Sequence, residues 1–347
     1  GSASGEVTFE RCSVTSDKGV VFTGGNYAGG IIGRCSAGGS ISNCTVAIPV
    51  SGGSYAGGLV GQAYTKPFSI SNSCMLADVA GTANIGGLVG AISVTGSFIT
   101  NSYVTGGVTS TGANVGGLVG QMSDVAVSNS YATGNVSSTN ASVGGIVGSM
   151  SKGTVSNCYA TGDVSASAND SKVGGIVGNN TTGTVEYSYA TGNISGVRSQ
   201  VGGLIGLANA SPTVNKCIAW NASVSVTGNA AGRYSCATIV GTMFPLGIAT
   251  DCVRIPGLTV SGLYEETDPT SAIYHMNGVF DQDNVTADAP LKNNIGVSVT
   301  NKKIESPLKF PYHGKAAGAT ETLSDVAKRL GWDVAVWDLS GNEPKLN

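Results

Sequence analysis

Tyrosine recurs at a nearly fixed interval in the middle of the chain. It lies within four related phrases, NSYVTG (101–106), SNSYATG (128–134), SNCYATG (156–162) and YSYATG (187–192). If copies of this phrase stack in register, Tyr103, Tyr131, Tyr159 and Tyr189 form an aromatic ladder. The ladder could bind sugar rings or another extended ligand, or it could only stabilise the stack. These four tyrosines are the candidate ligand-binding residues, and both interpretations stay open.

The residue before each tyrosine is serine or cysteine. Aligned by phase, this position holds Cys12, Cys44, Cys158, Cys217 and Cys252 in some copies and Ser73, Ser102, Ser130 and Ser188 in the others. A position that accepts either residue requires a small side chain, which we expect to point inward. Because neighbouring residues of a strand point to opposite faces, the tyrosines should then point outward.

The chain has eight cysteines and no C-x-x-C motif, so zinc and redox motifs are unsupported. Cys12 and Cys44, or Cys217 and Cys252, could lie on neighbouring repeats within reach of a disulfide. Side chains stacked in parallel register point the same way, which suits a disulfide poorly. We therefore expect free buried thiols, with a disulfide as the alternative.

Carboxylates and histidines are few and scattered. Asp78, Asn135, Asp163 and Asn193 share a third position, where either residue suits a turn and can bond its own backbone. Between residues 19 and 241 the acids are Asp78, Asp124, Asp163, Asp170 and Glu186. Asp163 and Asp170, with Lys172 nearby, are the only dense group, and DQDN (281–284) lacks the spacing of a calcium loop. His275 and His313 have no partners that spacing can identify. We therefore predict no catalytic residue, no metal and no cofactor.

A second phrase sets the period of the chain. It reads GG[LI][VI]G, and its final glycines fall at 33, 61, 90, 120, 148, 178 and 206. A degenerate copy of the phrase ends at Gly241. A period near 29 residues is typical of a solenoid and too short for a propeller blade. Each unit offers three short β-branched stretches, such as VGGIVG (173–178), TVEYSYA (184–190) and NISG (193–196), and none has a helical stripe. The sequence therefore predicts an all-β, right-handed parallel β-helix of about eight or nine coils.

The recurring glycines have two physical explanations. They could adopt positive φ in turns, or they could sit where two backbones approach closely. We expect a mixture of both.

Composition divides the chain. Residues 1–242 hold 17 charged side chains, and residues 243–347 hold the other 22. We assign 1–255 to the solenoid and 256–347 to an irregular region and a small α/β C-terminal cap. Thr322 and Asp325 form a capping-box pattern before a helical stripe that ends at Gly331, and DVAVWDLS (333–340) follows as a predicted strand. A lid over the open last coil is the expected role of this cap.

The two recurring phrases resemble the GLUG repeat of bacterial surface proteins, over roughly residues 5–255. GLUG repeats occur in the spacer regions of immunoglobulin A peptidases and in filamentous-haemagglutinin-like adhesins, and GWDVAVWDLSGNEPKLN (331–347) is similar to the segment that commonly closes such arrays. The resemblance implies a secreted, surface-displayed protein and implies no catalytic residue. The metalloprotease signature H-E-x-x-H is absent.

Net charge and the length of apolar runs restrict the classes of partner that we expect. The net charge of −3 gives no reason to expect nucleic acid as a partner, and no apolar run is long enough to span a bilayer. The chain lacks a signal peptide and begins with glycine, so we expect it to be processed or cut from a longer product, with outer-membrane anchoring through a removed N-terminal segment as one option. The sequence predicts a monomeric adhesion module that binds a glycan or an extracellular host protein. The alternatives are a purely structural spacer and a carbohydrate-active β-helix enzyme.

Overall fold

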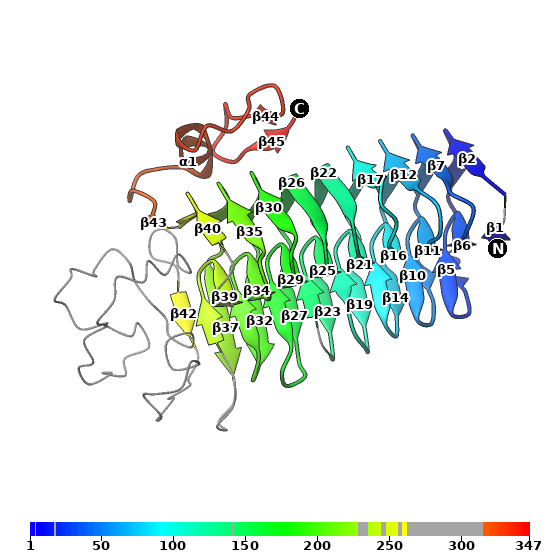
Figure 1. Cartoon of the computed structure of the whole chain (residues 1–347), viewed down its shortest axis with the longest axis horizontal. Helices are drawn as coiled ribbons and strands as arrows, with labels where there is room; N and C mark the ends of the chain where they lie inside the picture. The colour runs from blue at the N-terminus through cyan, green and yellow to red at the C-terminus, as the bar shows by residue number, and fades with distance from the viewer. Residues whose placement is uncertain are drawn as a thin grey trace.

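The chain folds into a long parallel β-solenoid with a small α/β segment on its flank (Figure 1). The computed structural model describes residues 1–3, 5–16, 19–140, 142–227, 235–243, 248–255, 259–261 and 315–347. Each coil adds one strand to each of three sheets and a longer or broken strand to a fourth. Along the chain, each coil passes in turn through four sheets, which we call D, A, B and C and define below. The predicted parallel β-solenoid is confirmed.

Sheets D and A flank the glycine phrase. Sheet D consists of β5 (Tyr27–Gly29), β10 (Tyr55–Gly57), β15 (Asn84–Gly86), β20 (Val115–Gly116), β24 (Ser142–Gly144), β28 (Lys172–Gly174), β33 (Gln200–Gly202) and β38 (Ser235–Ala237). Sheet A consists of β1 (Ser2–Ala3), β6 (Ile32–Cys35), β11 (Val60–Ala63), β16 (Val89–Ile92), β21 (Val119–Met122), β25 (Val147–Met150), β29 (Val177–Asn180), β34 (Ile205–Ala208) and β39 (Val240–Met243). The phrase is thus a tight turn between two strands, and the prediction of a single strand over 173–178 is wrong.

Sheet B carries the tyrosine phrase and sheet C follows it. Sheet B consists of β2 (Val7–Glu10), β3 (Ser13–Val14), β7 (Gly39–Ser42), β8 (Thr45–Val46), β12 (Phe68–Ser71), β13 (Cys74–Met75), β17 (Ser97–Thr100), β18 (Tyr103–Val104), β22 (Val125–Ala132), β26 (Gly153–Ala160), β30 (Thr184–Glu186), β31 (Tyr189–Ala190), β35 (Thr213–Asn215), β36 (Ile218–Ala219), β40 (Ile248–Thr250), β41 (Val253–Arg254) and β43 (Lys315–Ala316). Sheet C consists of β4 (Phe22–Thr23), β9 (Val50–Ser51), β14 (Val79–Gly81), β19 (Val108–Ser110), β23 (Val136–Ser138), β27 (Val164–Ala166), β32 (Ile194–Val197), β37 (Ser223–Thr227) and β42 (Thr259–Ser261).

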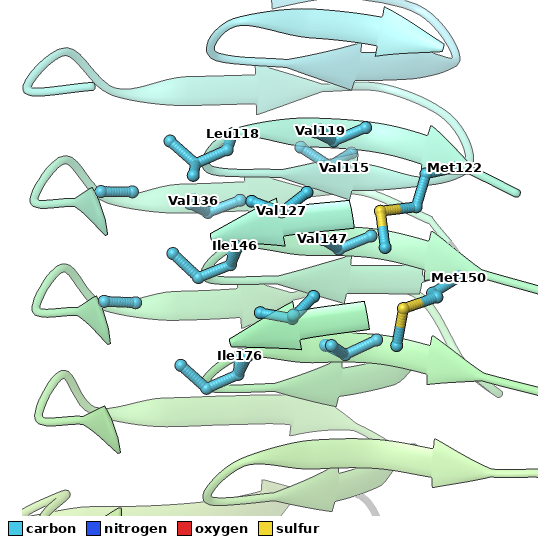
Figure 2. Packing of buried hydrophobic residues seen from close by; sticks show 14 of the residues in the cluster. Val115, Leu118, Val119, Met122, Val127, Val136, Ile146, Val147, Met150 and Ile176 are labelled. Carbon is cyan, nitrogen blue, oxygen red and sulfur yellow. The ribbon is translucent and has the colours of Figure 1, made fainter. Parts of the chain in front are cut away.

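Identical positions of successive coils lie directly over one another. Val119 pairs with Val147, and Tyr131 pairs with Tyr159. The inward side chains therefore form aliphatic columns, such as Leu118, Ile146 and Ile176, which are fully buried (Figure 2). Because neighbouring coils bury each other's apolar faces, the narrow core continues along the rod.

The motif glycines serve close packing only. None of them has positive φ. A Cβ on Gly116 would meet Val119 O, Gly148 N and Ile146 O, and a Cβ on Gly117 would meet Gly145 O of the next coil. The expected mixture of two roles is wrong for this motif. Positive φ recurs instead at one column of sheet B, which holds asparagine in five coils, at Asn43, Asn72, Asn101, Asn129 and Asn157, a residue type that tolerates the left-handed region.

The C-terminal segment, residues 315–347, begins as an extra strand, since β43 pairs with β41 of the last described coil. It continues into α1 (Leu323–Arg329), whose N-cap Thr322 forms the predicted capping box with Asp325. The antiparallel pair β44 (Trp337–Asp338) and β45 (Lys345–Leu346) follows, so only two residues of the predicted strand 333–340 are a strand. The segment folds back along the outer face of sheet B (Figure 1), so its position differs from the lid that we expected over the last coil.

Candidate functional site

The inward serines and cysteines of sheet B connect neighbouring coils. The Ser73 hydroxyl donates to Ser71 O at 2.7 Å and accepts the backbone N–H of Cys44 at 3.0 Å. Ser102 repeats this pattern with Thr100 O and the Ser73 N–H. The side chain thus supplies hydrogen bonds at the point where the left-handed asparagine interrupts the strand. The inward orientation predicted for this position is confirmed, and it places the next residue, the tyrosine, on the outer face.

All eight cysteines are free thiols, as expected, and seven are buried. Burial raises the pKa of Cys158 and of Cys252 to about 12, and it raises that of Cys217 well above its usual value. The thiolate is the reactive form, so these thiols are unreactive in the folded chain.

A labelling experiment checks this cysteine arrangement. We expect iodoacetamide at neutral pH to modify Cys12 first, because Cys12 alone of the eight is not buried. The other seven should react only when the chain unfolds in guanidinium chloride, as peptide mass spectrometry would show. Equal labelling rates for Cys158 and Cys12 in the native chain would contradict the structure.

The four candidate tyrosines form one continuous stack on the outer face of sheet B. Ring centroids lie 4.9 Å apart for Tyr103 and Tyr131, 4.7 Å for Tyr131 and Tyr159, and 5.0 Å for Tyr159 and Tyr189. The rings are parallel within 4–6°. Because neighbouring rings face each other, an incoming ligand meets the ring edges. The ladder exists as expected, yet it presents no row of open ring faces.

The C-terminal segment covers one half of this ladder. Trp337 lies across Tyr159 and Tyr189 at centroid distances of 6.2 and 5.9 Å, tilted by 48° and 50°. The Tyr189 hydroxyl donates to Pro344 O at 2.8 Å, and Tyr189 is only 2% exposed. Tyr103, Tyr131 and Tyr159 remain partly exposed. The ladder is therefore divided by its contacts into a covered half, Tyr159 and Tyr189, against which Trp337 packs, and an open half, Tyr103 and Tyr131.

A groove lies where the open half meets the edge of the C-terminal segment. Its volume is about 390 Å³, and its walls are Asn72, Asn101, Asn129, Tyr103, Tyr131, Ala335, Val336, Leu346 and Asn347. The asparagines are the left-handed residues that lie two positions before the ladder position in each coil. Sequence reasoning missed both the asparagine column and the covering segment. The asparagine that recurs in NS, SNS and SNC, and the two tryptophans in 331–347, were the available signals.

The ladder environment disfavours tyrosinate. A side-chain hydrogen bond with Cys74, followed by burial, raises the pKa of Tyr103 to about 12. Burial raises the pKa of Tyr131, and it raises the pKa values of Tyr159 and Tyr189 further under the C-terminal segment. Each tyrosine thus prefers its neutral form more in the folded chain than in the unfolded chain.

This shift predicts a loss of stability at high pH. A tyrosine pKa raised by folding stabilises the fold fully below pH 10, the unfolded value, and the contribution is lost as pH rises through the folded pKa. We expect the C-terminal segment to undock only as the pH rises well above 10, because Tyr159 and Tyr189 must ionise, with tyrosinate absorbance rising in the same range. A spectrophotometric titration with circular dichroism tests this. Titration of all tyrosines near pH 10 would contradict it.

The third recurring position has a different role from the one expected. Asp78 accepts the N–H of Gly107 at 2.8 Å, Asn135 accepts that of Asp163 at 2.9 Å, and Asp163 accepts that of Asn193 at 2.8 Å. These side chains bond the backbone of the next coil, so the prediction that they cap their own backbone is wrong.

Among the remaining acidic residues, Asp124 and Asp170 take part in structural contacts. Asp124 accepts a hydrogen bond from Thr95 and pairs with Lys152, contacts that lower its pKa. Lys172 donates to the backbone carbonyl of Asp170, so the dense group of the sequence closes a turn. Across the part of the chain that the structure describes, no three His, Cys, Asp or Glu side chains gather as metal ligands would. His275, His313 and DQDN (281–284) lie outside the described residues.

A helix that spans a membrane must be both long and apolar. Within the described ranges, no helix has the length and hydropathy required to cross a bilayer.

Comparison with known proteins identifies the repeat. The family model of the GLUG motif matches residues 139–165 and 170–195, the coils that carry Tyr159 and Tyr189. No curated protein sequence matches the chain significantly. Among solved structures, the chain is similar to a crystal structure described as "a putative immunoglobulin A1 protease from Bacteroides ovatus", with 18% identity over 87% of this chain and 86% of that one and a TM-score of 0.45.

Proposed function

We propose that this chain, a GLUG-repeat β-solenoid, is a secreted bacterial surface module that binds an extracellular ligand on the outer face of sheet B. The ligand is a glycan or a host protein, and it occupies the groove beside Tyr103 and Tyr131. One observation carries the proposal: the partly exposed rings of Tyr103 and Tyr131 and the amides of three asparagines line the same groove of about 390 Å³. Cavities of roughly 300–1,000 Å³ lined by aromatic side chains with a few polar groups are typical ligand sites.

A binding screen tests this function. The chain would be applied to a glycan array and to a panel of extracellular matrix proteins. We expect Tyr131→Ala to weaken any specific binding roughly tenfold or more, because aromatic residues at the centre of an interface carry much of the binding energy. Tyr55→Ala is the matched control, since Tyr55 stacks with Tyr27 at 5.2 Å in sheet D, outside the groove.

One observation favours a purely structural spacer as the second candidate. Tyr159 and Tyr189 already pack against Trp337 of the same chain, which shows that half of the ladder contributes to the fold. A spacer would bind nothing on either panel, with or without the Tyr131→Ala change. Binding that survives this substitution unchanged would place the ligand outside the groove.

A further inference from the structure

The C-terminal segment acts as a built-in ligand of sheet B. The Trp337 indole N–H donates to Asn157 Oδ1 at 3.2 Å, and the Trp332 indole N–H donates to Lys216 O at 2.9 Å. Asn157 and Lys216 belong to the same left-handed column, with φ of 51° and 50°. Both indoles therefore use their single donor on this column while their rings contact the tyrosine ladder.

The open half repeats the arrangement that Trp337 uses. Tyr131 pairs with Tyr159 across neighbouring coils, and the flanking Ser128 and Ser130 pair with Ser156 and Cys158. Asn129 is thus the equivalent of Asn157, with a φ of 48°. Asn157 accepts the indole N–H, whereas Asn129 Oδ1 is buried and has no hydrogen-bond partner. A half-turn about χ2 exchanges the oxygen and nitrogen of this amide, so a ligand in the groove can meet either group.

Ring orientation selects the chemistry of the ligand. Aromatic edges carry partial positive charge and attract the negative π face of another ring. The ladder offers mainly edges to a ligand, because neighbouring rings at 4.7–4.9 Å occupy both faces of Tyr131 and one face of Tyr103. A sugar packs its C–H groups, which are also partly positive, on an aromatic face. The edges of Tyr103 and Tyr131 therefore favour an aromatic ring over a sugar.

We infer that the groove binds an indole ring, presented by a tryptophan of a partner protein, which packs against Tyr131 and donates its N–H to Asn129, as Trp337 packs against Tyr159 and donates to Asn157. Val336 and Leu346 of the C-terminal segment form the apolar wall of the groove. This inference rests on the proposed function, and it names a protein segment as the ligand.

Small probes test the inference on the full chain. The binding of 5-fluoroindole and of 5-fluoro-1-methylindole, which lacks the N–H donor, would be measured by fluorine NMR. We expect N-methylation to weaken binding roughly tenfold, because a buried acceptor is then left unpaired. Asn129→Gly keeps the left-handed backbone and removes the amide, so it should weaken fluoroindole binding to a similar degree and abolish the preference between probes. Asn43→Gly, the same column position outside the groove, should change neither.

The outcomes separate this inference from the proposed function. Equal binding of the two probes, no binding of either, or no effect of Asn129→Gly would overturn the indole site. If methyl pyranosides bind in a Tyr131-dependent manner and fluoroindole does not, the ligand is a glycan and only this inference falls. If fluoroindole binds as expected but no macromolecule on the two panels does, the proposed adhesive function falls and the indole site stands.

Discussion

Gly116→Ala should be among the most damaging single substitutions in the solenoid. The new methyl group would lie 2.7 Å from Gly148 N and 2.8 Å from Ile146 O, and it would also collide with Val119 O. These are backbone atoms of two coils, so no side chain can rotate away. We expect the free energy of unfolding to fall by about 3 kcal/mol or more, measured by urea denaturation followed by circular dichroism.

The matched control is Gly107→Ala. A Cβ there meets no atom nearer than Asp78 Oδ1 at 3.4 Å, which is an ordinary contact, and Asn135 and Asp163 occupy the same position in later coils. This variant should unfold within about 0.5 kcal/mol of the parent. Similar losses for the two variants would show that the glycines are not required by close backbone packing.

Trp337→Ala should release the C-terminal segment from sheet B. Trp337 is 1% exposed, contacts Tyr159 and Tyr189, and donates to Asn157. Loss of a buried tryptophan costs about 3–5 kcal/mol, and the cost falls on the docking of residues 315–347. We expect faster proteolysis within this segment and faster hydrogen exchange at Tyr159 and Tyr189, with residues 27–71, which precede the groove lining, unchanged.

Val334→Ala serves as the control in the same segment, because Val334 is 71% exposed. It should leave proteolysis at the parent rate. If Trp337→Ala leaves the segment as protected as Val334→Ala does, the tryptophan is not the anchor that the structure indicates.

Several features of the fold followed from the sequence because they repeat. The period of the glycine phrase predicted parallel coils, and the alternation of serine or cysteine with tyrosine predicted which residues point inward. Both are local properties of a strand, and each coil restates them. Thr322 and Asp325 likewise predicted the start of α1 from a contact between residues three positions apart.

The features that sequence reasoning missed depend on contacts between distant residues. The hydrogen bond from Trp337 to Asn157 joins residues 180 positions apart, and nothing in a repeat pattern indicates where a non-repeating segment docks. The left-handed asparagines were missed for a different reason. Turn residues were sought at the glycines, whereas the motif glycines are required by steric contact and Asn129 and its equivalents carry the positive φ.

The central claim is that the outer face of sheet B is divided into an open half and a half covered by the chain's own C-terminal segment. Hydroxyl-radical footprinting with peptide mass spectrometry tests it most directly. The structure predicts rapid oxidation of Tyr103 and Tyr131, protection of Tyr189 in the intact chain, and loss of that protection in Trp337→Ala. Oxidation of Tyr189 at the rate of Tyr131 in the intact chain would contradict the account.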